Sequence, residues 1–368
     1  MNRIYYQDLA KQGLSMPIGA DLVLHGEPDV AAVLRDGAAL GRVVEKTARR
    51  FATPLAIPLM DLQLEKATLL RGLDIPAADV ATYHFEEPPT DAQMETLRRR
   101  VREPLSPQQQ AHVDAVAYVA RHAPDLVPCG MLIGPFSLMT KLLKDPITPV
   151  YLSGMGVTTA EDPAVAGLER ALELAMLVVE RSLRAQLAVG ARLVCVAEPA
   201  ANRVYVSPKQ IEEGSDVHER MVMKNLRRLK AIMDEHHADL FFHCCGELTD
   251  YMLGKFSELD PAVMSLGSSR PLWDVAKVVP ATTVLFGNLP SKQFFSDKVI
   301  SIEAVKAQAS DLVARMQAIG RPFILGSECD VLYVNGCEET ISRKVDAFLE
   351  IGRGCGCGCC HPDKPAAA

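Results

Sequence analysis

Phe-Phe-His-Cys-Cys-Gly, at residues 241–246, ends a short and mostly apolar run that begins at Ala238. A short apolar run that stops abruptly is typical of a buried strand, and this one delivers an imidazole and two thiols, which are metal-binding side chains. A second stretch, Phe-Ile-Leu-Gly-Ser-Glu-Cys-Asp at residues 323–330, has the same form, with a thiol near its end. The fold of the chain decides whether these two strand ends meet around a metal ion.

Apolar runs alternate with amphipathic segments along most of the chain. The amphipathic segments, which we predict to be helices, include residues 28–51, 108–122, 163–188, 216–237, 301–319 and 338–351. The predicted strands comprise residues 20–24, 54–60, 126–133, 192–197, 238–242, 263–267, 283–287 and 323–329. Because continuous apolar strands that alternate with helices are typical of a parallel sheet covered by helices, we predict an α/β protein.

The number of strand–helix units favours a (β/α)8 TIM barrel over a doubly wound sheet. No Gly-x-Gly-x-x-Gly motif follows an early strand, which argues against a dinucleotide-binding fold. We therefore predict one barrel domain over residues 1–352 and a short, flexible Cys/Gly-rich tail over residues 353–368. The C-terminal ends of all strands open at one mouth of such a barrel, so these residues at predicted strand ends are expected to converge: Asp61, Gly134, Glu198, His243, Cys245, Asn288 and Cys329.

The composition excludes several classes of function. The net charge is −7 and no basic run exceeds a few residues, so a nucleic-acid partner held by clustered cations is not expected. No apolar stretch approaches the roughly 20 residues that span a bilayer, and the first residues lack the apolar segment of a signal peptide. We expect a cytoplasmic protein without membrane contact, in which cysteines stay reduced and Cys129 and Cys195 are core residues.

The spacing of the thiols and the histidine predicts a zinc site. In an extended strand, residues two apart point to the same side, so His243 and Cys245 can reach one ion while Cys244 faces the other way. Cys329 from the later strand completes a set of one nitrogen and two sulfurs, which suits zinc and leaves a fourth position open, as in catalytic sites. A thiol substrate is a natural fourth ligand, and alkyl transfer to or from sulfur is the implied chemistry. Two alternatives stay open: Cys244 as the ligand in place of Cys245, and a chance grouping of core residues.

Four further polar residues near strand ends are candidates for the same mouth. Asp61 and Glu65 lie four apart, so a helix that starts there would put both acids on one side, although acids at a helix start are also ordinary dipole partners. Glu198 is fixed at a strand end by Pro199, where it could hydrogen-bond a zinc ligand or the substrate. Asn288 is either a turn residue or a ligand contact.

Several motifs together resemble a known family, the methylcobamide:coenzyme M methyltransferases of the uroporphyrinogen decarboxylase superfamily. The stretch at residues 243–246 resembles its His-x-Cys-Gly zinc motif, and the likeness extends over about residues 17–350. Further motifs similar to the family's stand at residues 60–65, 134–138, 189–200, 207–208, 287–289 and 324–330. The chain departs from the pattern at Val189, at Glu198, where aspartate is usual, and at Glu328, where glycine is common.

This resemblance implies a barrel fold and a zinc-dependent methyl transfer between a methyl-corrinoid (cobalamin) protein and an acceptor, a small thiol or tetrahydrofolate. In that scheme the metal ligands are His243, Cys245 and Cys329. The predicted catalytic residues are Asp61 and Glu198, and the predicted substrate-binding residues are Glu65 and Asn288.

The same superfamily supplies an alternative, a carboxy-lyase of the uroporphyrinogen decarboxylase type, which works on a tetrapyrrole in porphyrin biosynthesis. Such enzymes need no metal and place an aspartate at an early strand end, as Asp61 does. They also carry an arginine-rich N-terminal motif for propionates, whereas residues 1–19 hold Arg3 and Lys11 as their only cations. That difference and the zinc set favour methyl transfer.

The tail has no counterpart in the family pattern. It contains Cys355, Cys357, Cys359, Cys360 and His361, separated mainly by glycines, a spacing that argues against a packed element. It is either a soft-metal or redox site or an oxidation-prone end. A third hypothesis follows, in which the chain is a non-enzymatic metal- or corrinoid-binding partner and the tail is its working part.

Overall fold

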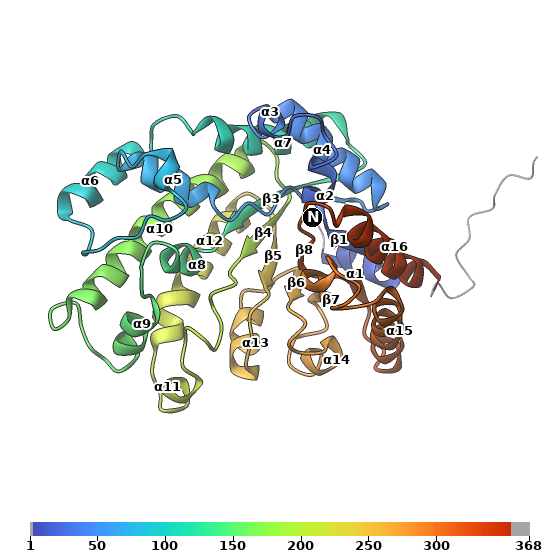
Figure 1. The fold of residues 1–368 in the computed structure, drawn as a ribbon. Coiled ribbons are helices and arrows are strands. Elements are labelled where there is room, and N and C mark those ends of the chain that lie inside the picture. Colours follow the sequence, from blue (N-terminus) through green and yellow to red (C-terminus); the bar gives the residue numbers. More distant parts are fainter. Residues whose placement is uncertain (1–2, 355–368) are drawn as a thin grey trace, which may run out of the picture.

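The computed structural model describes residues 3–354, which form an α/β fold with the strands at its centre and helices around them (Figure 1). Within these residues one sheet contains eight strands, all paired in parallel: β1 (Ser15–Ile18), β2 (Leu55–Ala56), β3 (Val127–Ile133), β4 (Leu193–Ala197), β5 (Asp239–Cys244), β6 (Val263–Leu266), β7 (Val284–Leu289) and β8 (Phe323–Asp330).

The strand order makes the sheet barrel-like. The order is β1-β8-β7-β6-β5-β4-β3-β2, so strands that follow one another in the chain are neighbours from β2 through to β8. The two end strands lie close together, since the hydroxyl of Thr53, just before β2, donates to the Sδ atom of Met16 in β1 at 2.9 Å. The curled sheet therefore has a TIM-barrel-like arrangement, in agreement with the predicted class.

An apolar cluster fills the inside of the curl. Side chains from every strand belong to it, including Met16, Leu55, Cys129, Cys195, Phe241, Val263, Phe286 and Ile324. Burying such side chains contributes roughly 1.5–3 kcal/mol for each large one. Cys129 and Cys195 are core residues, as predicted.

Helices surround the sheet, and most of them bury apolar side chains against it or against one another. Before β4 they are α1 (Arg3–Lys11), α2 (Ala20–Leu24), α3 (Val30–Val33), α4 (Gly37–Arg50), α5 (Leu64–Gly72), η1 (Ala77–Asp79), α6 (Asp91–Arg100), α7 (Pro107–His122), α8 (Pro135–Thr140), α9 (Ile147–Gly154) and α10 (Pro163–Ala188). After β4 they are α11 (Pro208–Glu212), η2 (Glu219–Met223), α12 (Lys224–Glu235), α13 (Asp250–Ser257), α14 (Leu272–Val275), η3 (Ser291–Gln293), α15 (Ile302–Ala318) and α16 (Glu338–Gly354). No helix of residues 3–354 is long and apolar enough to cross a membrane.

Local sequence signals explain the best-predicted helices. The carboxylate of Asp162 accepts the N–H groups of Ala164 and Val165 and so caps α10, whose first residue is Pro163. Ser301 caps α15 by accepting the N–H of Ala304. Both helices occupy the residues predicted for them, residues 163–188 and 301–319, to within one residue at the ends.

The predictions were wrong in the first quarter of the chain. Residues 20–24 are helix α2 rather than a strand, and the first strand is β1, just before them. A short apolar run is compatible with either element, because it covers too few residues to reveal a period. The segment predicted as one helix over residues 28–51 is two, because the carboxylate of Asp36 accepts the N–H of Ala39 and starts α4 afresh.

Two other elements also differ from prediction. Only Leu55 and Ala56 of the predicted strand at residues 54–60 pair with β3, because Pro58 has no N–H to donate. The predicted helix at residues 216–237 contains a π-helical segment, η2, before α12.

The packing inside the curl predicts the effect of a glycine substitution. A Cβ atom added at Gly326 would lie 2.5 Å from Cζ of Phe286 and 2.7 Å from the main-chain oxygen of Met16. Both neighbours are buried, so Gly326→Ala should lower stability by about 1–3 kcal/mol, measured as a fall in the thermal unfolding midpoint.

Gly254 provides the matched control for this substitution. It lies inside α13 with nothing within 4 Å of an added Cβ atom, so Gly254→Ala should be neutral or stabilise by up to about 1 kcal/mol. Equal midpoints for the two variants would contradict the packing described here.

Candidate metal centre

Three predicted ligands meet at the C-terminal ends of two strands. His243 lies in β5, Cys245 follows its last residue, and Cys329 lies near the end of β8. One ligand atom from each residue can be chosen so that all three lie within 4.8 Å of one another. Because β6 and β7 lie between β5 and β8 in the sheet, it is the curl of the sheet that brings these ends together.

The ring of His243 is held in one orientation. The two residues His243 and Ser265 are opposite each other in the β5–β6 pairing, and the Nδ1 atom lies 2.9 Å from the hydroxyl oxygen of Ser265. The Nε2 atom is buried and has no hydrogen-bond partner among the described residues. An unpaired buried polar atom is unfavourable, and a metal ion at Nε2 would satisfy it while Ser265 fixes the ring, as is usual for metal-binding histidines.

The two cysteines are coupled to each other. A hydrogen bond from the Cys329 thiol is the largest influence that lowers the pKa of Cys245, and His243 and Lys292 act in the same direction against burial. The same hydrogen bond, together with burial, raises the pKa of Cys329. The hydrogen bond therefore favours the thiolate form of Cys245, and the thiolate is the form that binds metal.

Cys244 lies on the other face of the strand, as the alternation predicts. It is fully buried in the apolar layer between the sheet and the helices, in contact with residues such as Leu266 of β6. Burial raises the pKa of its thiol. This environment favours Cys245 over Cys244 as the ligand.

The donor set fits a zinc ion. One imidazole nitrogen and two sulfurs are the ligand types that zinc takes, and three protein ligands leave one position of a tetrahedral site for water or substrate. His243, Cys245 and Cys329 can therefore hold the ion.

Glu198 is joined to the site through the main chain. It directly follows β4, and its N–H donates to the carbonyl oxygen of His243 at 2.8 Å. Its buried carboxylate accepts the N–H of Ser137 at the start of α8 and lies against Gly134, where an added Cβ atom would be 1.9 Å from Oε2. Burial raises the pKa of Glu198 to about 7. The carboxylate thus holds the β3–α8 turn, and its catalytic role stays a prediction.

Asp61 and Glu65 are not on one helix face, which corrects the prediction. Helix α5 begins only at Leu64, and Asp61 lies before it, where its carboxylate accepts the N–H of Gln63 at 2.9 Å. Glu65 is buried and accepts the hydroxyl of Ser182 in α10 at 2.7 Å. Burial raises the pKa of Glu65 to about 7, against that hydrogen bond and with a further upward contribution from the Asp61 charge.

Asn288 holds the connection that follows β6. Its side-chain amide donates to the carbonyl oxygens of Gly267 and Arg270, at 2.8 and 2.7 Å. Asn288 itself lies in β7 and pairs with Gly326 of β8, so it is not a turn residue, and its amide instead fixes the turn that follows β6. These bonds leave a role in substrate binding untested.

Two residues of the site were missed by sequence reasoning. Ser265 lies in a predicted strand, and the parallel pairing of β5 with β6 is the signal that could have found it. Lys292 lies in η3, four residues after Asn288, and against the effect of burial the charges of Cys245, Glu328 and Cys329 raise its pKa. Lys292 could have been found from the sequence, because it is a cation that follows closely after a strand ending at the barrel mouth.

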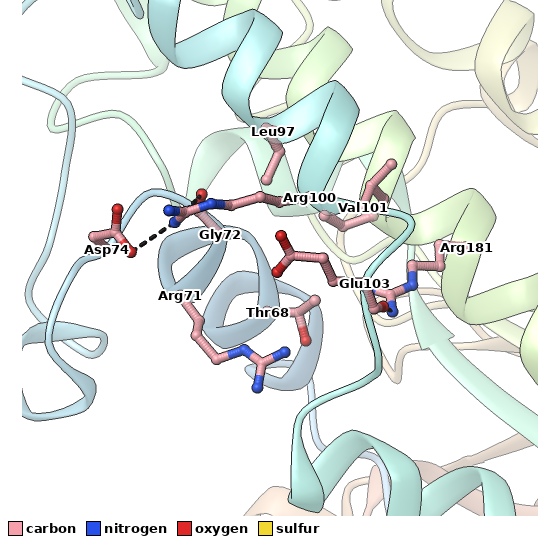
Figure 2. A pocket seen from close by; sticks show the side chains of 10 residues that line it. Thr68, Arg71, Gly72, Asp74, Leu97, Arg100, Val101, Glu103 and Arg181 are labelled. Carbon is pink, nitrogen blue, oxygen red and sulfur yellow. Dashed lines mark hydrogen bonds and ion pairs between the residues drawn. The ribbon is translucent and has the colours of Figure 1, made fainter.

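A surface cavity of about 360 Å³ lies elsewhere, among α5, α6 and α10. Figure 2 shows Arg100 reaching across it to the carboxylate of Asp74, at 2.6 Å. Arg71 donates to the carbonyl oxygen of Pro104 at 2.8 Å, and Arg181 donates to that of Glu103. None of the predicted ligands lines this cavity, so it is separate from the thiol site.

Comparisons with known proteins agree with the fold. The model of the uroporphyrinogen decarboxylase (URO-D) family matches residues 29–350. Among solved structures, a methyltransferase from Methanosarcina mazei is similar, with a TM-score of 0.62 and 13% sequence identity over 93% of this chain and 97% of that chain. At that identity the similarity shows a shared fold and nothing more. A search of curated proteins gave no significant match.

The geometry of the three ligands predicts which cysteine retains the metal. Protein purified with zinc should contain about one ion per chain, and Cys245→Ala or Cys329→Ala should lose most of it, because two ligands bind far more weakly than three. Elemental analysis after gel filtration measures the content.

Cys244→Ala is the matched control, since it removes the neighbouring thiol on the other face of the strand. It should keep its zinc. Zinc loss in Cys244→Ala with retention in Cys245→Ala would reverse the assignment.

The buried carboxyl of Glu65 predicts a pH dependence of stability. Its pKa is about 7 when folded, against an ordinary value of 4.5. Its contribution to the free energy of unfolding is therefore fully present below pH 4.5 and is lost as the pH rises through 7. Between pH 4.5 and 8, the free energy of unfolding of Glu65→Gln should fall by roughly 3 kcal/mol less than that of the wild type, measured by denaturant unfolding. The exposed Glu95→Gln should follow the wild type, and identical pH profiles for all three proteins would contradict the prediction.

Proposed function

Because the chain belongs to the uroporphyrinogen decarboxylase family, we propose that it is a methyltransferase of the zinc- and corrinoid-dependent branch of that family. It would move a methyl group between a methyl-corrinoid protein and a thiol or similar acceptor, such as tetrahydrofolate. The proposal includes a complete (β/α)8 barrel as a single domain over residues 1–352, and a cytoplasmic location.

One observation carries the proposal: the convergence of His243, Cys245 and Cys329, with the Nε2 atom of the histidine buried and unpaired among the described residues. A decarboxylase that needs no metal has no use for two thiols and an imidazole within 4.8 Å of one another. A methyltransferase needs such a group, because a metal bound by it can hold the acceptor thiol as its thiolate.

Zinc bound by these ligands would lower the pKa of an acceptor thiol and keep its sulfur nucleophilic at neutral pH. The protein side of the site supplies orientation. Ser265 fixes the imidazole of His243 through Nδ1, and the main-chain bond from Glu198 to His243 ties β4 to β5 at the height of the ligands. A ligand set held this firmly loses little freedom when the acceptor arrives.

The proposed transfer forms a carbon–sulfur bond and breaks a cobalt–carbon bond. The electron pair of the cobalt–carbon bond stays with the corrinoid, and the proton of the acceptor thiol goes to solvent. We assign Asp61 and Glu198 to catalysis and Glu65 and Asn288 to substrate binding, all near the same ends of the strands. The corrinoid is a substrate carried by a partner protein, which would dock at this end of the barrel.

The alternative is decarboxylation of a tetrapyrrole, the activity for which the family is named. A substrate with many carboxylates needs several cations. Arg3, the one arginine of residues 1–19, is engaged in an ion pair with Asp260 and also donates to its carbonyl oxygen at 2.7 Å. That pairing weakens the alternative without bearing on methyl transfer.

The proposal predicts demethylation of methylcobalamin. Zinc-loaded protein is mixed with methylcobalamin and, in turn, with each of several small thiols or tetrahydrofolate, and in at least one mixture the spectrum should change to that of the demethylated corrinoid. Removal of zinc should slow the reaction by about 100-fold or more, since a catalytic metal lowers the barrier by several kcal/mol. Cys244→Ala should retain the activity, whereas Cys245→Ala should not.

Other outcomes separate the alternatives. Full activity in metal-free protein would contradict the proposal, and loss of carboxylates from uroporphyrinogen would favour the decarboxylase. Loss of function on deletion of residues 353–368, with zinc still bound at the barrel, would favour the non-enzymatic hypothesis. That tail lies almost wholly outside the described residues.

A further inference from the structure

Three arginines from three different helices line the surface cavity among α5, α6 and α10 (Figure 2). Arg71 lies in the last turn of α5, Arg100 is the last residue of α6, and Arg181 lies in the second half of α10. The volume of about 360 Å³ is within the range of small-molecule sites, roughly 300–1,000 Å³. Because like charges repel, a cavity that gathers three guanidinium groups favours a ligand of negative charge.

Only one of these arginines forms an ion pair within residues 3–354. Arg100 pairs with Asp74 at 2.6 Å. Arg71 and Arg181 each donate instead to a main-chain carbonyl oxygen of the connection between α6 and α7. A carbonyl oxygen carries no net charge, so these bonds hold the two guanidinium groups in place without neutralising them.

The two guanidinium groups without an ion pair lie close enough to repel each other. Burial, and after it the charge of Arg71, lowers the pKa of Arg181, while Glu103 acts more weakly in the opposite direction. Glu103 is exposed, and its carboxylate forms no hydrogen bond or ion pair among the described residues. The three arginines and two acids of the lining leave one positive charge in excess, in a chain whose net charge is −7.

The lining also indicates the class of ligand. A guanidinium group has five N–H donors in a planar fork that matches the oxygens of a phosphate. A phosphate monoester carries about −1.5 to −2 charges at pH 7 and can balance both Arg71 and Arg181, whereas a carboxylate can balance only one. Leu97, Val101 and Val178 form an apolar part of the lining, which suits a small organic group attached to the phosphate.

We propose that this cavity binds a small phosphate monoester. Arg71 and Arg181 hold the phosphate, and the organic group packs against the three apolar side chains. Glu103 opposes binding, since its charge has the same sign as the ligand. The site is separate from the thiol ligands, so this inference does not depend on the proposed methyl transfer.

The experiment measures binding by isothermal titration calorimetry, with the full-length protein in a phosphate-free buffer of low ionic strength, which limits screening. Phenyl phosphate is the probe, and inorganic phosphate and phenol test its two halves separately. The proteins compared are the wild type, Arg71→Met, Arg181→Met, Glu103→Gln and Arg184→Met. Arg184 lies on α10, as Arg181 does, but it is exposed and does not line the cavity, so it controls for loss of a surface charge.

The wild type should bind one phenyl phosphate per chain, and both inorganic phosphate and phenol should bind more weakly. Arg71→Met and Arg181→Met should each weaken binding by about tenfold or more, the usual effect of losing a hydrogen bond to a charged group. Glu103→Gln should bind about threefold more tightly or better, because it removes a like charge. Arg184→Met should match the wild type.

Several results would overturn the inference. They are the absence of saturable binding in the wild type, an affinity unchanged in both Arg71→Met and Arg181→Met, and phenol or inorganic phosphate that binds as tightly as phenyl phosphate. The two arginines also hold the connection between α6 and α7, so their substitution can disturb the fold. Glu103→Gln removes no hydrogen bond of the side chain within residues 3–354, and weaker binding in that variant would contradict the inference independently of folding.

Discussion

The register of β5 is the constraint on which the site depends. Its pairing with β4 and β6 turns Phe241 into the curl and Phe242 toward the helices. A shift of one residue would exchange the two faces and present Cys244 in place of His243 and Cys245. The bulky, fully buried phenylalanines on both faces make that shift costly, so packing far from the ligands selects which thiol reaches the mouth.

Residues in or next to four other strands complete the metal site. Ser265 of β6 orients the imidazole of His243, and Cys329 of β8 shares a hydrogen bond with Cys245. The N–H of Glu198, after β4, holds the main chain of His243. Glu198 and Asn288 use their side chains to fix neighbouring connections, at the β3–α8 turn and after β6. These buried polar residues at the strand ends thus support the ligands.

The sequence was enough to predict the fold class, the long helices and the shared face of His243 and Cys245. Each of these features follows from a repeating pattern of apolar residues or from the alternation of side chains along a strand. Cys329 was reached through strand ends and family resemblance together. Residues 20–24 were wrongly predicted as a strand, and Asp61 was wrongly placed on one helix face with Glu65. A short apolar run and an isolated acid contain no repeating pattern that identifies the element. Ser265 and Lys292 were missed because their roles come from register and from a one-turn helix, which only three-dimensional packing defines.

The most direct test of the central claim is X-ray absorption at the zinc edge of the purified full-length protein. We expect two sulfur neighbours at about 2.3 Å and one or two nitrogen or oxygen neighbours at about 2.0–2.1 Å. Addition of an acceptor thiol should raise the sulfur count to three. A first shell without sulfur, or one with four sulfurs before any thiol is added, would contradict the assignment of His243, Cys245 and Cys329 as the ligands of an open site.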